Sequence, residues 1–142
     1  MPTWLLLFLN VFFFVFHTVL IVVNVFGWIF RRTLRLNLIT LLLTATSWGI
    51  MGLKYGLGYC ICTDWQWKVR HALGIHDQAR TFNQLLVFKL SGWLPSESLT
   101  STVTAVVFFV SLTASIVLNV RDSRKRLATK RQYANFCGSR QL

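Results

Sequence analysis

The chain has 142 residues, of which 54% are hydrophobic and only 13% are charged. Soluble domains usually carry a smaller apolar share, so the composition favours a membrane protein of one domain. The net charge of +11 is gathered beside apolar segments, where basic side chains contact lipid headgroups and orient helices. We therefore expect no nucleic-acid partner.

The first apolar segment runs from about residue 4 to residue 30 and contains no formal charge. It is long enough to cross a membrane, and it lacks the basic start and the small-residue cleavage site of a signal peptide. We predict a retained transmembrane helix, which Arg31, Arg32 and Arg35 follow directly.

A polar stripe runs along this first helix. Asn10, His17 and Asn24 recur at a step of seven residues, which returns to nearly the same helix face. Polar groups are costly against lipid, so the stripe is expected to face other helices. His17 could relay protons, ligate haem or hydrogen-bond a quinone. Ordinary helix packing favours the alternative, a neutral histidine bonded across to the second or third helix.

The second predicted span covers about residues 36–57, and the third covers about residues 99–120. Ser96 and Glu97 precede the third with the capping hydroxyl and first-turn carboxylate that favour a helix start. In residues 78–93, apolar side chains recur at helical spacing, and the longest apolar run is too short to span a membrane. We predict an amphipathic helix lying in the membrane interface there.

The positions of the basic residues predict the topology. Three arginines connect the first two spans, and seven basic residues occupy residues 121–142. Three spans place both regions on one side, which the positive-inside rule identifies as the cytoplasm. The expected fold is an all-α membrane protein with three transmembrane helices and one interfacial helix in residues 1–120, with the N-terminus outside and the C-terminus inside. Residues 121–142 form a basic cytoplasmic tail that contacts anionic lipid headgroups.

The connection after the second span concentrates reactive side chains. Cys60 and Cys62 have one residue between them, whereas redox pairs usually have two, and a zinc site needs two further ligands. Ordinary thiols at a helix end are favoured over a redox pair, and no metal site is predicted.

Charged and aromatic residues follow these thiols at once. If Asp64 starts a short helix, it caps that helix and pairs with Lys68 four residues later. Trp65 would anchor such a helix among the headgroups. The functional alternative is an outward-facing lipid or partner site around Asp64, Trp65 and Arg70.

Several of these positions together resemble a bacterial family of small polytopic membrane proteins, the domain of unknown function twenty-seven eighty-four. That family has a histidine in its first helix and a tryptophan in its second. A Cys-Pro-Leu-Thr element, a glutamate, an arginine and an aromatic-leucine helix then precede the last span. Over about residues 8–127 of this chain, the matching positions are His17, Trp48, Cys60, Thr63, Arg70 and the segment 82–90. Ile61, Cys62 and Gln66 replace the proline, the leucine and the glutamate, as in a divergent branch. The resemblance implies a bacterial inner-membrane location.

The sequence contains no complete catalytic set, and its polar helix faces suit packing between helices. The favoured function is a non-enzymatic accessory, assembly or scaffold subunit, without a cofactor, that packs against a membrane-protein partner or copies of itself. Two alternatives stay open: a redox or cofactor protein using His17 or the Cys60 and Cys62 thiols, and a lipid- or small-solute-handling protein. The candidate binding residues are Asn10, His17, Asn24, Cys60, Thr63, Asp64, Trp65 and Arg70; none is assigned a catalytic role.

Overall fold

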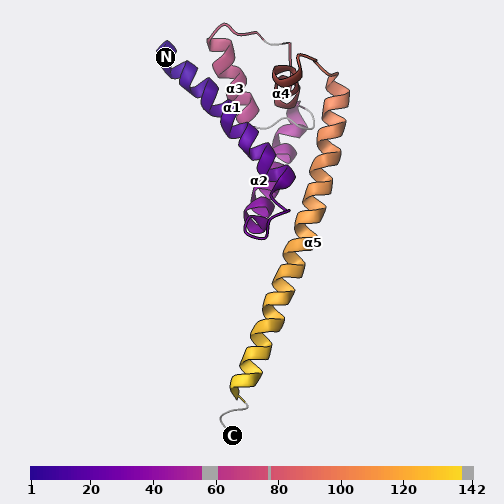
Figure 1. The fold of residues 1–142 in the computed structure, drawn as a ribbon. Coiled ribbons are helices and arrows are strands. Elements are labelled where there is room, and N and C mark those ends of the chain that lie inside the picture. Colours follow the sequence, from indigo (N-terminus) through magenta and orange to yellow (C-terminus); the bar gives the residue numbers. More distant parts are fainter. Residues whose placement is uncertain (56–60, 77, 139–142) are drawn as a thin grey trace.

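The computed structural model describes residues 1–55, 61–76 and 78–138, with side chains at residues 1–51, 61–76 and 78–132. This part of the chain forms five helices and no strand (Figure 1): α1 (Thr3–Phe26), α2 (Leu34–Tyr55), α3 (Ile61–Ala72), α4 (Phe82–Ser91) and α5 (Glu97–Gly138). Three of them, α1, α2 and α5, are long and apolar enough to cross a membrane. The all-α class and the three predicted spans are therefore confirmed.

The distribution of side chains between interior and surface is that of a membrane protein. Large apolar residues such as Phe8, Val19 and Leu43 are exposed along the three long helices. The buried polar residues of the described chain are His17, Asn24, Asn37, Thr63, Gln66, Arg70, Gln84, Thr100, Ser111 and Ser115. A soluble protein places apolar residues inside. Apolar surfaces around a polar interior instead fit helices that lipid surrounds.

The first helix ends at Phe26, four residues before the expected boundary, because the chain turns tightly at Gly27. A Cβ atom on Gly27 would overlap the Val23 carbonyl oxygen and lie 3.0 Å from the Asn37 Cβ. This close approach lets Asn37 Nδ2 donate to the carbonyl oxygens of Val23 at 2.7 Å and Asn24 at 3.2 Å. The Asn37 amide from α2 thereby adds a second donor to the Val23 carbonyl oxygen, which also accepts the backbone N–H of Gly27 at 2.8 Å, and ties the end of α1 to α2.

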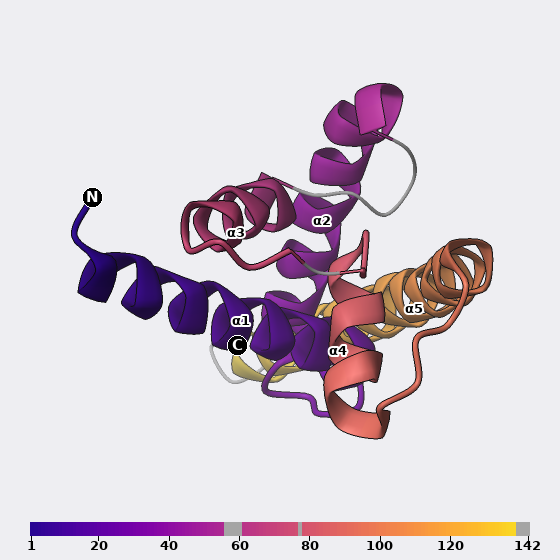
Figure 2. The same ribbon diagram turned by 90° about the horizontal axis from the view of Figure 1, so that it is seen from above.

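The two short helices lie at the end of the molecule opposite the α1–α2 turn (Figure 1). Seen from above, α3 lies in the angle between α1 and α2, and α4 lies between α1 and α5 (Figure 2). α4 is shorter than the predicted segment 78–93: it begins after Thr81 with a capping box and ends at Gly92, whose φ of 72° is left-handed. α3 lies where we predicted a short helix on the condition that Asp64 starts it. Asp64 lies in the first turn of this helix.

The last helix starts as predicted, with the backbone N–H of Leu99 donating to Ser96 Oγ at 3.3 Å. It passes α2, where Asn119 Nδ2 donates to the Leu34 carbonyl oxygen at 3.0 Å. The helix does not end with its apolar run at residue 120 but continues to Gly138 (Figure 1). The basic segment that follows residue 120 is therefore a helical extension of the third span over its described length.

Candidate functional site

A cavity of about 470 Å³ lies among the helices, and all five contribute to its wall. Phe16, Leu41, Trp48 and Phe108 form much of its apolar surface. Trp48 of α2 and Phe108 of α5 pack with their ring centroids 4.6 Å apart. Polar side chains interrupt this surface at His17, Asn24, Thr40, Thr44, Ser47, Thr63, Thr81, Asn83, Thr104 and Ser111. An apolar pocket with a few placed polar groups is the usual form of a small-molecule site.

His17 enters the cavity wall from α1. Its imidazole stacks on the ring of Phe82 from α4, with centroids 4.2 Å apart and planes 9° apart. The histidine is buried, and Phe82 is only 3% exposed, so the two rings fix α4 against the middle of α1. The predicted inward direction of the polar stripe is confirmed for His17 and for Asn24, the two buried residues of α1.

Asn24 and two threonines of α2 form a polar contact at the end of the cavity near the α1–α2 turn. Asn24 Nδ2 donates to Thr44 Oγ1 at 3.0 Å, and Thr44 Oγ1 donates to the Thr40 carbonyl oxygen at 2.8 Å. Asn37 Nδ2 also donates to the backbone carbonyl oxygen of Asn24. These side-chain hydrogen bonds join α1 to α2 within the apolar region.

The buried face of α3 consists of Thr63, Gln66 and Arg70. These residues are spaced by three and four positions, which places them along one side of the helix. Arg70 Nη1 donates to Asn10 Oδ1 of α1 at 3.1 Å, and its guanidinium carbon lies 5.9 Å from the centroid of the Trp67 ring. Two predicted binding residues that are sixty positions apart, Asn10 and Arg70, therefore meet, although neither of them lines the cavity.

The other predicted residues of this segment point elsewhere. Asp64 lies in the first turn of α3 and pairs with Lys68 at 2.7 Å; the pair is confirmed, but Asp64 is not the residue before the helix, because α3 already includes Ile61. Trp65 is 52% exposed and tilts against Phe13 of α1. Neither Asp64 nor Trp65 lines the cavity.

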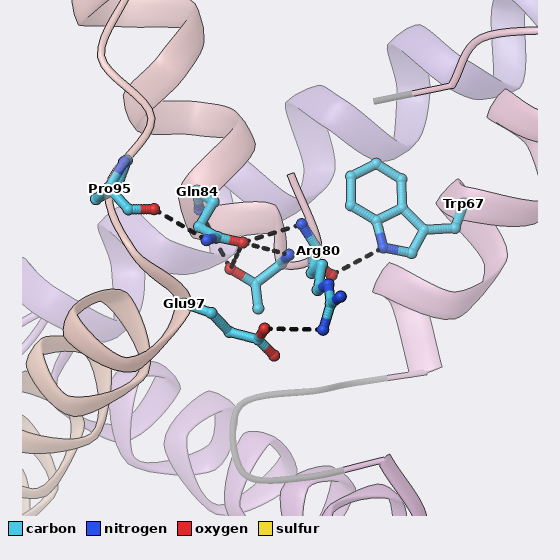
Figure 3. Close-up of polar contacts among 6 residues, drawn as sticks. Trp67, Arg80, Gln84, Pro95 and Glu97 are labelled. Carbon is cyan, nitrogen blue, oxygen red and sulfur yellow. Dashed lines mark hydrogen bonds and ion pairs between the residues drawn. The ribbon is translucent and has the colours of Figure 1, made fainter. Parts of the chain in front are cut away.

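A second network holds the short helices to the start of α5 (Figure 3). Trp67 Nε1 donates to the Arg80 carbonyl oxygen at 3.1 Å, and Arg80 Nη1 lies 3.3 Å from Glu97 Oε2. Gln84 Nε2 donates to the Pro95 carbonyl oxygen at 3.0 Å. These contacts link α3, α4 and α5 above the cavity.

Residues 7–120 match the family described as Protein of Unknown function (DUF2784). The chain belongs to this family. Neither the curated proteins nor the solved structures give a match. The DUF2784 match includes every residue that lines the cavity, and it ends at the residue before the basic extension of α5.

The positions that carry the family resemblance gather around the cavity. His17, Trp48 and Thr63 line it, whereas Arg70 is buried on the same face of α3 as Thr63 but does not line it. Cys60 lies outside the described residues, whereas its neighbour Cys62 lines the cavity. Among the described residues, no three His, Cys, Asp or Glu side chains are grouped closely enough to hold a metal ion.

Sequence reasoning did not select Gln66, Asn83 or Thr104 as binding residues. Gln66 is 1% exposed, and within the described part of the chain neither end of its amide has a hydrogen-bond partner. Its spacing from Thr63 and Arg70 could have identified it once residues 61–72 were read as a helix. Asn83 and Thr104 are brought together only by the packing of α4 on α5.

Proposed function

We propose that the protein binds a lipid-soluble small molecule inside the membrane, in the cavity among its five helices. The observation that carries this proposal is the cavity itself, with its apolar and aromatic wall and the ten polar side chains that interrupt it. It favours a small-molecule-binding protein over a purely structural accessory subunit, because helices that serve only to pack together gain by closing such a space. The proposed site differs from the outward-facing one that the sequence suggested, because Asp64, Trp65 and Arg70 do not line the cavity.

Access from the bilayer fits the same proposal. Several residues that line the cavity are also largely exposed, among them Phe16 at 44%, Leu43 at 65% and Val103 at 52%, so the cavity is not sealed off by the protein. An apolar molecule dissolved in lipid could therefore approach between the long helices without crossing water.

The proposed orientation places the N-terminus, α3 and α4 outside and the two basic regions in the cytoplasm of a bacterial cell. Figure 1 supports it, because the α1–α2 turn and the extended half of α5 lie toward the same end of the molecule. The first basic residues after the span, Arg121 and Arg124, are exposed where anionic headgroups would lie.

Two valines on α5 provide a matched test of binding. Val107 lines the cavity, whereas Val110 is 60% exposed and does not line it. Wild type, Val107→Phe and Val110→Phe would be purified from membranes in mild detergent, and bound small molecules would be identified by native mass spectrometry. We expect a retained molecule in wild type and in Val110→Phe, and its loss in Val107→Phe, where the added ring fills the cavity. Absence of a bound molecule from wild type, or equal retention by both variants, would contradict the proposal.

A further inference from the structure

One pair of side chains in the cavity wall has donor and acceptor groups that no hydrogen bond within the described part of the chain uses. Asn83 of α4 and Thr104 of α5 both line the cavity, and Asn83 Nδ2 donates to Thr104 Oγ1 at 2.8 Å. Within the described part of the chain, this is the only hydrogen bond that either side chain makes. The pair therefore uses one donor and one acceptor and leaves others available.

The pair has an unused donor and an unused acceptor in either orientation of the Asn83 amide. With Asn83 Nδ2 as the donor, Thr104 keeps its hydroxyl proton and Asn83 keeps its Oδ1 acceptor. If the amide is turned over, the Thr104 hydroxyl donates to Oδ1, leaving the amide N–H₂ and a hydroxyl lone pair. Either arrangement offers one donor and one acceptor side by side.

The polar groups at the opposite end of the cavity are used within the protein. The hydroxyls of Thr40 and Thr44 donate to carbonyl oxygens of their own helix, and the Asn24 amide nitrogen donates to Thr44. Asn24 Oδ1 is covered by neighbouring atoms. The donors at this end are therefore used within the protein, whereas the Asn83–Thr104 pair keeps a donor and an acceptor side by side, and a polar head would be recognised there.

The lining also restricts the charge of the ligand. No Asp, Glu, Lys or Arg is among the described residues that line the cavity. A carboxylate or phosphate would lose its hydration there without a lining group of opposite charge to replace it, which is costly. The wall therefore selects against charged headgroups.

We infer that the cavity takes an uncharged lipid-soluble alcohol, whose hydroxyl group donates to one member of the Asn83–Thr104 pair and accepts from the other. A hydroxyl is both a donor and an acceptor, so it matches the pair, whereas an ether only accepts. The apolar body extends along α5 toward Trp48 and Phe108, which is one helical turn from Thr104. This inference rests on the proposed function and names the class of molecule bound.

Bromine quenches indole fluorescence on contact, so Trp48 can report occupancy of the cavity. The probes are ω-bromohexanol, its methyl ether and ω-bromohexanoate, titrated into the full chain in lipid nanodiscs, with Trp48→Phe to identify the cavity signal. We expect wild type to bind the alcohol about tenfold more tightly than the ether, from the hydrogen bonds that the ether cannot complete. The carboxylate should bind at least about a hundredfold more weakly than the alcohol.

Thr104→Val and Asn83→Leu should each remove most of the preference for the alcohol, while the ether still quenches Trp48 in both variants, which shows that the cavity is intact. Thr113→Val is the matched control, because Thr113 is exposed on the same helix. Equal binding of alcohol and ether by wild type, tighter binding of the carboxylate, or a preference that survives both cavity variants would overturn the inference and leave the proposed function standing. Absence of Trp48 quenching by every probe would refute the proposed function itself.

Discussion

Gly27 and Asn37 determine where the first hairpin turns, and both act through close contact. Gly27 has an ordinary right-handed backbone, with φ of −64° and ψ of −19°, so its value lies in the space that a missing Cβ leaves. The Asn37 side chain and the Val23 carbonyl oxygen occupy that space. A tight turn is needed here because α1 and α2 begin to pack against each other at once.

Gly27→Ala should lower the stability of the fold by about 1–3 kcal/mol, the usual cost of overpacking. The readout is thermal unfolding of the purified chain in mild detergent. Gly49→Ala is the matched control, because a Cβ at Gly49 meets no atom within 4 Å and alanine favours a helix. We expect the control to unfold at the wild-type temperature or slightly above it. If both variants behaved alike, close contact at Gly27 would not explain the turn.

The polar residues illustrate what a sequence reveals at this scale. His17 and Asn24 could be assigned to the interior because a heptad step and the cost of polar groups in lipid leave few alternatives. The Asn10–Arg70 contact and the Asn83–Thr104 pair could not be predicted, because each joins two helices whose relative rotation depends on packing. A periodic pattern identifies a face, but the partner across that face is a property of the assembled fold.

At the scale of elements, the N-terminus of α4 joins two helices through one side chain. Gln84 Oε1 accepts from the backbone N–H groups of Arg80 at 2.9 Å and Thr81 at 3.1 Å, while its Nε2 donates to the Pro95 carbonyl oxygen (Figure 3). The capping box therefore also fixes the connection that leads into α5. Gln84 is only 4% exposed, so water cannot readily replace these bonds.

Gln84→Ala should loosen α4 selectively, by about 1–3 kcal/mol of local opening free energy, because buried backbone groups lose their partners. Hydrogen–deuterium exchange in nanodiscs should show faster exchange over residues 80–96 and unchanged exchange in α1 and α2. Gln78→Ala is the control, since Gln78 is exposed and precedes the cap. Equal protection of α4 in the two variants would mean that packing on α5, rather than the cap, holds the helix.

The long helices were predictable as elements, whereas their ends and the helix α3 were less so. Apolar length alone specified α1, α2 and α5 as spans. α3 mixes charged, aromatic and small residues, and its buried side is polar, so apolar periodicity does not mark it. α5 continues beyond its apolar run because residues such as Arg124, Lys125 and Arg126 have high helix propensity and are stable in water.

At the scale of the whole molecule, the extended half of α5 is a consequence of helix continuity. Its 42 residues make about 63 Å of helix, roughly twice the thickness of a hydrocarbon core. The ion pair between Asp122 and Arg126, at 2.7 Å, lies on the helix just after the apolar run. In the proposed orientation, Lys130 and Arg131 would therefore lie well outside the hydrocarbon core, farther from it than Arg121.

The proposed orientation rests on the positions of the basic residues and can be tested directly. In a chain without its native cysteines, Gln78→Cys and Ser123→Cys place single thiols on exposed positions at opposite ends of the fold. A membrane-impermeant maleimide applied to intact bacterial host cells should label Gln78→Cys at once and Ser123→Cys only after permeabilisation, because basic segments are retained in the cytoplasm. Replacing Arg31, Arg32 and Arg35 by alanine weakens one of the two retained segments and should yield a fraction with Ser123→Cys labelled in intact cells. If intact cells labelled Ser123→Cys and not Gln78→Cys in the parent chain, the proposed topology would be wrong. The end of the fold that carries α3 and α4 would then face the cytoplasm.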